Sequence, residues 1–283
     1  MERDSFADCL QRIFLISMKQ YQEKHQLIVE WLHEARKRIL DALTKDFAID
    51  TKANKNDLVT EVDRLTEQFF IEKIRKNFPG HKILGEEGFG DELQTDEGVI
   101  WLIDPIDGTM NFVHQKQNFA ISLAIYENGT GMAGYIYDVV RDELYYAIRG
   151  AGAFYQDERL PRLIDVPLEE ALIGMNALWL VENKRADHRL ITPLVHRAHG
   201  IRSYGSAALE LAYVATGRLN GYISFNLMPW DYAAGKVIVE EVGGLVTTTS
   251  GRPVSILKKG SLFVSTPDLH KEIIKGYLAK AEK

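Results

Sequence analysis

Residues 99–112 constrain the fold of this chain more than any other stretch. The five apolar residues that open the stretch predict a buried strand, and two carboxylates, Asp104 and Asp107, follow where that strand ends. Pro105 cannot donate a hydrogen bond to a sheet and Gly108 tolerates unusual backbone angles, so we expect a sharp turn here. The turn directs both carboxylates toward the mouth of the sheet, where open α/β and α+β folds commonly carry their sites.

The two carboxylates predict a site for a hard divalent cation. Carboxylates held this close repel each other unless a positive charge lies between them. Oxygen ligands without a nearby His or Cys suit magnesium, manganese or calcium. The alternative is that Asp104 and Asp107 only form hydrogen bonds within a turn or cap a helix, since Asp favours both roles.

The composition excludes several other classes of protein. With 283 residues, 46% of them hydrophobic and 26% charged, the chain has the make-up of a soluble globular protein with a substantial core. A net charge of −6 without a block of like charges argues against a dedicated nucleic-acid binder. The single cysteine excludes an intrachain disulfide framework and a thiolate zinc cluster. The first residues lack a signal peptide or a membrane span, so we expect a cytoplasmic protein without membrane contact.

The first half of the chain is predicted to combine helices with an antiparallel sheet. Apolar residues at helical spacing predict a helix through residues 27–40, and the looser pattern of residues 6–21 predicts a separate short helix or one that faces a partner. A second helix is expected to open at Asp57 and to stop at Pro79. Alternating apolar residues around the turn at Asn128 predict strands at residues 81–84, 119–126, 132–139 and 144–148.

The second half is predicted to alternate strands and helices. We expect strands at residues 171–175, 201–204, 221–225, 245–249 and 262–265, and helices at residues 186–199, 207–216, 232–242 and 268–281. The pattern changes near residue 160, so the expected organisation is two halves of one catalytic unit, residues 1–160 and 161–283.

Several separated motifs occur in a specific order. They are Gly85-Glu86-Glu87, residues 104–112 and Trp230-Asp231-Tyr232, supported by residues 57–63 and by Gly205-Ser206-Ala207-Ala208. Together they resemble the inositol monophosphatase family of metal-dependent, lithium-sensitive sugar phosphatases, in its bacterial type. The likeness covers residues 27–281 and implies a layered α-β-α-β-α fold, with an antiparallel-sheet half joined to a mixed α/β half.

The resemblance implies a site with two or three Mg²⁺ ions, with Mn²⁺ as an alternative. Glu86, Asp104 and the carbonyl of Ile106 would bind the first ion. Asp104 would bridge to a second ion held also by Asp107 and Asp231, and Glu86 would reach a third through water. The alternative for Asp231 is that it only caps the helix that follows it.

The resemblance also implies in-line attack by a metal-activated water on a phosphomonoester. Thr109 and Asp63 would orient that water, with Glu86 as a further catalytic residue, unless Asp63 is only a surface residue of its helix. The backbone amides of Gly108 and Thr109 would hold phosphate oxygens, and Asp107 would also contact the substrate. Weaker substrate contacts are predicted at Gly205, Ser206 and Ala207.

The substrate is predicted to be inositol monophosphate or a related small sugar or polyol phosphate. Inositol-specific members of the family often carry a Glu where this chain has Ser224, so fructose 1,6-bisphosphate, NADP and 3′-phosphoadenosine 5′-phosphate stay open. Lys52 matches a family lysine near the outermost metal better than Lys55 does. The family also implies a homodimer.

Two competing hypotheses remain at this point. A haloacid-dehalogenase phosphatase also has Asp-Gly-Thr after a buried strand, but its two aspartates are one residue apart, whereas Pro105 and Ile106 intervene here. A phosphorylated aspartate would support that hypothesis. The other hypothesis is a non-catalytic binding partner with a structural metal site, in which the N-terminal helix would contact the partner protein.

Overall fold

The computed structural model describes the backbone of residues 6–45, 49–51 and 58–283. The predicted roles of Lys52, Lys55 and Asp57 lie outside these described residues. The helical elements are α1 (Phe6–Leu43), α2 (Glu61–Asn77), α3 (Thr109–Gln115), η1 (Leu168–Glu170), η2 (Ala177–Leu180), α4 (His188–Arg197), α5 (Ala207–Ala215), α6 (Pro229–Glu241), α7 (Pro267–Ile273) and the short π-helix η3 (Ile274–Leu278).

The strands form two large sheets and one short hairpin-like pair. The pair joins β1 (Ile49–Thr51) to β2 (Leu58–Thr60). A seven-stranded sheet has the order β3-β4-β5-β6-β7-β8-β9, and a five-stranded sheet has the order β11-β10-β12-β14-β13. Their bounds are β3 (Lys82–Gly85), β4 (Val99–Asp107), β5 (Ala120–Glu127), β6 (Thr130–Asp138), β7 (Glu143–Ile148), β8 (Gly152–Tyr155), β9 (Glu158–Arg159), β10 (Leu172–Met175), β11 (Gly200–Arg202), β12 (Gly221–Leu227), β13 (Leu245–Thr247) and β14 (Gly260–Ser265).

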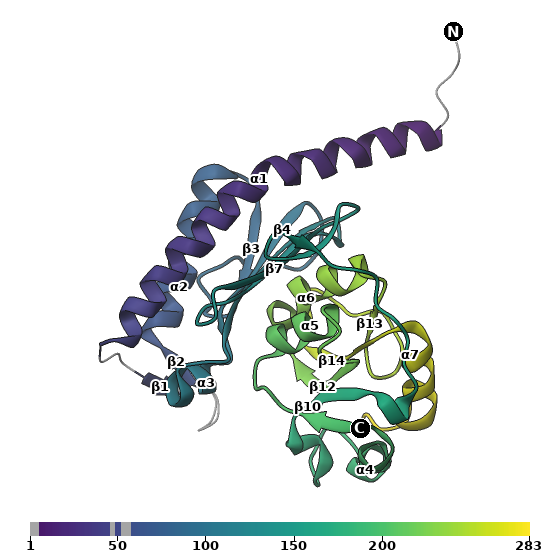
Figure 1. Cartoon of the computed structure of the whole chain (residues 1–283). Coiled ribbons are helices and arrows are strands. Elements are labelled where there is room, and N and C mark those ends of the chain that lie inside the picture. Colours follow the sequence, from purple (N-terminus) through teal and green to yellow (C-terminus); the bar gives the residue numbers. More distant parts are fainter. Residues whose placement is uncertain (1–5, 46–48, 52–57) are drawn as a thin grey trace.

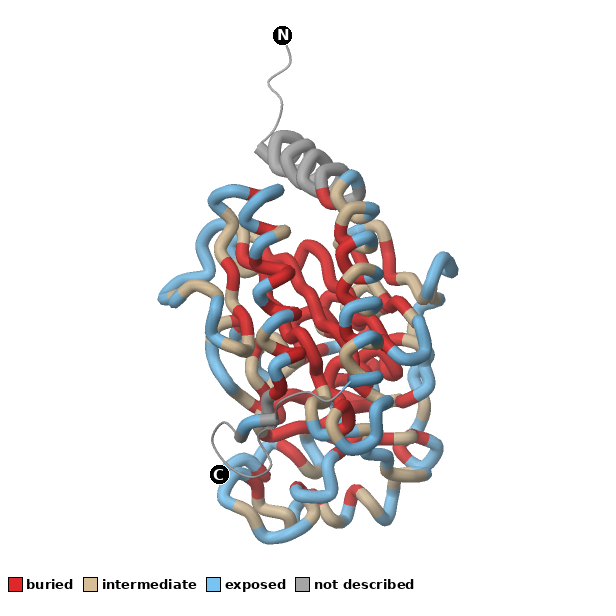
Figure 2. The backbone as a smooth tube through the Cα atoms, turned by 90° about the vertical axis from the view of Figure 1, so that its left-hand side faces the viewer, coloured by how far each residue is buried: buried red, intermediate tan, exposed pale blue. Residues whose placement is uncertain are grey.

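The elements stack in the order helix, sheet, helix, sheet, helix, as expected (Figure 1). Helices α1 and α2 cover the outer face of the seven-stranded sheet, helices α5 and α6 fill the space between the two sheets, and α4 and α7 cover the outer face of the five-stranded sheet. The buried residues follow the strands through these layers (Figure 2). The fold class predicted from the sequence is confirmed.

Strand β4 shows how residue alternation builds two of the cores. Trp101 and Ile103 pack in the outer core with α1 and α2, whereas Ile100 and Leu102 pack in the core shared with α5 and α6. Neighbouring residues of a strand point to opposite faces, so one apolar run serves both layers. The strand is therefore buried on both sides and fixes the position of whatever follows it.

Several boundaries differ from the sequence-based expectation, and the largest differences in the first half concern its first two helices. Residues 6–21 do not form a separate helix, because α1 continues without a break to Leu43. The second helix begins at Glu61 rather than at Asp57, because Thr60 is its N-cap and forms a capping box with Asp63. The hairpin turn at Asn128 and Gly129 is confirmed, with both residues at positive φ. Across the described residues, no helix has the length and apolar content needed to cross a membrane.

Candidate active site

A bulge in β4 turns both central aspartates to the same face. The predicted sharp turn lies at Gly108, whose φ is 97°, between β4 and α3, and not at Pro105, because the strand continues to Asp107. Asp104 and Asp107 are three residues apart, yet their partners on β5 are only two residues apart, so β4 carries one extra residue. A bulge tolerates Pro105 because a ladder hydrogen bond is lost there. It shifts the alternation by one residue, so Ile106 packs in the outer core while both aspartates line the inner cavity.

Glu86 reaches the same cavity through the neighbouring strand. Strand β3 runs parallel to β4, with Gly85 opposite Ile103. The backbone N–H of Glu86 donates to the carbonyl of Ile103 at 3.2 Å, which extends this pairing by one residue. Glu86 therefore lies level with Asp104 at the end of the two strands, and both residues line the cavity.

Asp107 binds the N-terminus of α5. Ser206 Oγ donates to Asp107 Oδ2, and the backbone N–H of Ala208 donates to the same oxygen at 2.8 Å. The N–H of Ala207 donates to Asp107 Oδ1 at 3.3 Å. A carboxylate at a helix N-terminus satisfies free amides and interacts favourably with the helix dipole. Ser206 and Ala207, two of the predicted substrate contacts, are thus engaged with Asp107.

Asp231 enters the cavity from the first turn of α6. Its Oδ2 accepts a hydrogen bond from the backbone N–H of Met228 at 2.9 Å, so the capping role considered as an alternative is present. The same side chain also lines the cavity with Asp104 and Asp107. Strand β12, which leads to this helix, has a register shift between Ser224 and Leu227. Asp231 therefore caps helix α6 and lines the cavity at the same time.

The electrostatics of this cluster favour a cation. Burial raises the pKa of Asp104 well above its ordinary value, and the charges of Glu86, Asp107 and Asp231 raise it further. Burial also raises the pKa of Asp231, with added repulsion from Asp107 and Glu86. The pKa of Asp107 rises to about 6, because burial outweighs the hydrogen bonds from Ser206 and the α5 amides. A positive charge between these groups would remove the cost of ionising them.

The donors fit a hard divalent cation in their chemistry. The cavity is lined by Ile106 and by five carboxylates, those of Glu86, Asp104, Asp107, Glu210 and Asp231, so its charged ligands are all oxygen donors. Within the described part of the chain, no group of three or more His, Cys, Asp or Glu side chains is placed so that it could hold a metal ion without rearrangement. The assignment of each residue to a particular ion therefore stays a prediction.

Thr109 and Asp63 meet beside the carboxylate cluster. Thr109 Oγ1 donates to Asp63 Oδ1 at 3.3 Å and also lies 3.2 Å from the carbonyl oxygen of Ile106. Asp63 is fully buried, and its Oδ2 accepts from the backbone N–H of Thr60 at 2.9 Å. The surface-residue alternative for Asp63 is therefore wrong. The capping box fixes its carboxylate, and only Oδ1 faces Thr109.

Besides Asp231 and Glu210, the second half of the chain supplies several uncharged polar residues to the cavity lining. The cavity has a volume of about 340 Å³, which suits a small phosphorylated molecule. Its lining also includes Asn176, Ser203, Ser224 and Asn226, together with the half-exposed Leu178, and these residues are called the uncharged wall below. Asn226 Oδ1 is one of the few buried side-chain atoms in the described residues without a hydrogen-bond partner.

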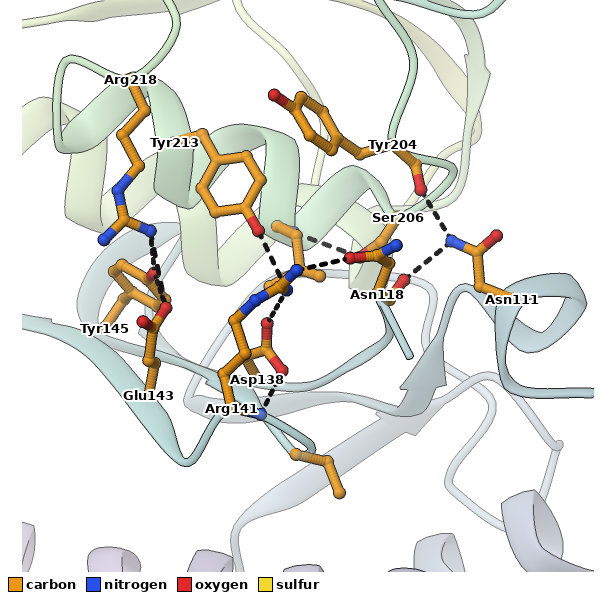
Figure 3. Close-up of polar contacts among 12 residues, drawn as sticks. Asn111, Asn118, Asp138, Arg141, Glu143, Tyr145, Tyr204, Ser206, Tyr213 and Arg218 are labelled. Atoms are coloured by element: carbon orange, nitrogen blue, oxygen red, sulfur yellow. Dashed lines mark hydrogen bonds and ion pairs between the residues drawn. The ribbon is translucent and has the colours of Figure 1, made fainter. Parts of the chain in front are cut away.

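Asn111 ties the two halves together next to this wall. Its Nδ2 donates to the carbonyl oxygens of Asn118, at 2.8 Å, and Tyr204, at 2.7 Å (Figure 3). Asn118 is in turn bound by Arg141, which forms an ion pair with the buried Asp138. Helix α3 and the turn that precedes α5 are therefore held in a fixed relation.

Two buried glutamates that bind turns of the site are not predicted from the sequence. Glu67 on α2 accepts hydrogen bonds from the loop that carries Glu86, and Glu210 on α5 accepts from the turn before Ser206. The available signal was helical spacing, because Glu67 lies four residues after Asp63 and Glu210 lies four residues after Ser206. Burial raises the pKa of Glu210 to about 7, although the hydrogen bonds that its carboxylate accepts from backbone N–H groups act to lower it.

Buried carboxylates at strand ends, a helix N-terminus and one polar cavity define a class of protein. The class is that of hydrolases that process phosphate esters with hard divalent cations. The family model described as the inositol monophosphatase family matches residues 20–282. The chain therefore belongs to the inositol monophosphatase family, whose members are phosphoric monoester hydrolases.

Individual relatives agree with this membership over most of their length. The chain is 52% identical over 261 residues to the inositol-1-monophosphatase of Bacillus subtilis, covering 92% of this chain and 98% of the relative. Among solved structures, the second inositol monophosphatase of Staphylococcus aureus with bound inositol monophosphate matches with a TM-score of 0.80 and 39% identity, covering 90% and 93% of the two chains. An IMPase/NADP phosphatase complexed with Mg²⁺ and phosphate matches with a TM-score of 0.85 and 31% identity, covering 93% and 98%. The family membership overturns the haloacid-dehalogenase hypothesis.

Proposed function

We propose that the chain is a magnesium-dependent phosphomonoesterase that hydrolyses inositol monophosphate or a related small sugar phosphate. The observation that carries this proposal is the meeting of Glu86, Asp104, Asp107 and Asp231, from distant parts of the chain, in one cavity where burial and nearby negative charge raise the pKa values of the three aspartates. The Bacillus subtilis relative named inositol-1-monophosphatase supports the choice of substrate.

The proposed ligands are those with oxygen donors at the acidic end of the cavity. They are Glu86, Asp104, the carbonyl of Ile106, Asp107 and Asp231. Bound Mg²⁺, as two or three ions, or Mn²⁺ in its place, would lower the pKa of a coordinated water and stabilise charge on the phosphate. The relative solved with Mg²⁺ and phosphate supports this choice. A similar staphylococcal inositol monophosphatase, solved as an inhibitory complex after soaking in LiCl, supports the proposal that lithium inhibits this chain.

Thr109 and Asp63 would orient the attacking water. An ionised Asp63 is a stronger acceptor than a backbone carbonyl, so the single hydroxyl proton of Thr109 is directed toward Asp63 Oδ1. The lone pairs of Thr109 Oγ then remain to accept a proton of a water molecule. The capping box holds Asp63 in place, so the direction of this hydrogen bond is fixed.

The remaining contacts would hold the substrate. The amides of Gly108 and Thr109 lie at the start of α3, where backbone N–H groups lack helical partners and can bind phosphate oxygens. The uncharged wall with Ser203, Ser224 and Asn226 offers acceptors and donors for the hydroxyl groups of a polyol.

A second candidate substrate is a nucleotide phosphate such as NADP. The buried Ser224 leaves this wall without the acidic group that inositol-specific relatives often carry there, and the apolar Leu178 is half exposed at the cavity. An apolar surface of this kind suits a larger, less hydroxylated leaving group. The similar IMPase/NADP phosphatase supports this candidate.

We further propose one catalytic unit, a homodimer and a cytoplasmic location. The single unit is supported by the cavity, since residues 1–160 contribute Asp104 and residues 161–283 contribute Asp231. The dimer follows from the family resemblance, and light scattering after size-exclusion chromatography would test it.

A substrate panel with and without metal tests the proposed function. Phosphate release from inositol 1-phosphate, fructose 1,6-bisphosphate, 3′-phosphoadenosine 5′-phosphate and NADP is measured in saturating Mg²⁺ and again with EDTA. We expect at least one of these substrates to be hydrolysed in Mg²⁺, and we expect EDTA to abolish that hydrolysis. Turnover that survives EDTA, or no release from any member of the panel, would contradict the proposal.

A further inference from the structure

Glu67 holds the loop that carries Glu86. Its side chain projects from α2 and is fully buried. Glu67 Oε2 accepts the N–H of Glu87 at 2.7 Å, and Oε1 accepts the N–H of Phe89 at 3.0 Å. A Cβ atom on Gly85 would lie 2.5 Å from the Glu67 carboxyl carbon, so only glycine leaves room for this carboxylate. Each oxygen thus binds one amide of the loop.

Glu210 holds the turn that engages Asp107. It projects from α5, is only 3% exposed, and its Oε1 accepts the N–H groups of Tyr204 at 2.7 Å and Gly205 at 3.4 Å. Ser206, the next residue, donates to Asp107. A Cβ atom on Gly174 would lie 2.6 Å from Glu210 Oε2, so this carboxylate also occupies space left by a strand glycine.

We propose that Glu67 and Glu210 are a pair of positioning residues, which fix Glu86 and Asp107 respectively through the backbone amides of two turns. Each is a buried helix glutamate that packs against a strand glycine. Glu67 binds amides of the loop that carries Glu86, and Glu210 binds amides of the turn just before Ser206, which donates to Asp107. This inference rests on the proposed function, because the ligands that it positions are those of the proposed metal site. Outer residues that orient metal ligands commonly change metal affinity 10- to 100-fold when they are removed.

The two glutamates differ in a way that an isosteric substitution reveals. Glu67 uses both oxygens, so a glutamine there must turn an NH₂ group toward one of the two loop amides. Glu210 uses only Oε1, and its Oε2 has no hydrogen-bond partner. A glutamine at position 210 keeps the Oε1 acceptor and places its NH₂ group at the position of Oε2, so no hydrogen bond is lost.

Metal affinity measured on the full chain tests the pair. Mn²⁺ binding is followed by electron paramagnetic resonance for the wild type and for Ala and Gln variants at both positions. We expect Glu67→Ala, Glu67→Gln and Glu210→Ala to weaken binding about 10- to 100-fold, and Glu210→Gln to stay within about threefold of the wild type. Equal binding by Glu210→Ala and the wild type, or equal loss in Glu210→Ala and Glu210→Gln, would overturn the inference.

Glu241 provides the matched control. Its carboxylate also accepts hydrogen bonds from two turn amides, those of Gly150 at 2.9 Å and Gly152 at 3.0 Å, but this turn carries no proposed metal ligand, and Glu241, unlike Glu210, does not line the cavity. Glu241→Ala should therefore lower the melting temperature without weakening Mn²⁺ binding. If Glu241→Ala instead weakens Mn²⁺ binding as much as Glu210→Ala does, the loss in both variants reflects general destabilisation of the fold, and the inference is overturned. Failure of the wild type itself to bind Mn²⁺ would contradict the proposed function instead.

Discussion

The two walls of the cavity are built differently. On the acidic wall, Asp104, Asp107 and Asp231 each accept a hydrogen bond from the protein, and these bonds fix their side chains. On the uncharged wall, Asn226 Oδ1 is buried without a partner and Leu178 is half exposed. The acidic wall is thus fixed by the protein alone, whereas the other wall retains capacity for a ligand. The difference suggests a division of roles, in which the acidic wall carries the chemistry shared by the family and the uncharged wall carries the choice of substrate.

The largest expected effect comes from Asp104→Asn on the acidic wall. Losing one charge from the centre of the cluster removes a proposed bridging ligand, so we expect kcat/KM to fall on the order of 10³- to 10⁴-fold. Phosphate release in saturating Mg²⁺ measures this. Asp165→Asn, at an exposed aspartate that accepts from the N-terminus of α7, is the matched control and should remain active. Comparable activity of the two variants would break the assignment of the acidic wall.

The next effect is expected from Thr109→Ala. This change removes the hydroxyl that donates to Asp63 and leaves every carboxylate in place. We expect kcat to fall about 10²-fold, while Mn²⁺ affinity stays near that of the wild type. Thr109→Ser retains the hydroxyl and should recover most of the rate. An unchanged kcat for the alanine variant would remove Thr109 from the water-orienting role.

A smaller and selective effect is expected from Asn226→Ala on the uncharged wall. The substitution removes an acceptor that has no partner in the protein, so stability should change little. We expect kcat/KM for inositol 1-phosphate to fall about 2- to 10-fold, with p-nitrophenyl phosphate almost unaffected because it has no hydroxyl group to bind. An equal loss for both substrates would show that Asn226 supports the fold rather than the substrate.

The smallest expected effect is a pH dependence of stability in the metal-free chain. Asp107 has a pKa of about 6 in the folded chain against an ordinary 3.8, so the folded state binds its proton more tightly. The stabilisation is complete below the ordinary pKa and is lost as pH rises through about 6. In EDTA, the melting temperature should rise by a few degrees as pH falls from 7 to 5. Asp107→Asn should reduce this slope, whereas Asn226→Ala should preserve it.

Most of the acidic wall could be predicted because residue type and position along the chain carry the information. Glu86, Asp104 and Asp107 follow apolar strand patterns, and Asp231 opens a helix, so local rules bring each to the edge of a sheet. The order of the motifs then predicted the family, which the family model confirms. The roles of the individual residues in catalysis stay predictions.

The parts that could not be predicted depend on contacts between distant segments. The bulge in β4 is visible only against its partner strand β5, and the bond from Ser206 to Asp107 joins residues 99 positions apart. Glu210 looks like an ordinary helix residue until the turn that it binds is folded against it. The continuity of α1 was missed because its first turns have a weaker apolar pattern than the rest.

The extra residue of β4 also limits how this chain can vary. Deleting Ile106 would restore regular pairing with β5 and would still leave both aspartates on one face, because residues two apart in a strand share a face. It would, however, remove the outer-core side chain of Ile106 and the carbonyl oxygen that lies 3.2 Å from Thr109 Oγ1. Adding a residue would displace the helix that starts with Thr109 from Asp63. The interval between the two aspartates therefore sets where Ile106 and Thr109 lie, and a homologue with a different interval would need another way to place a hydroxyl beside Asp63.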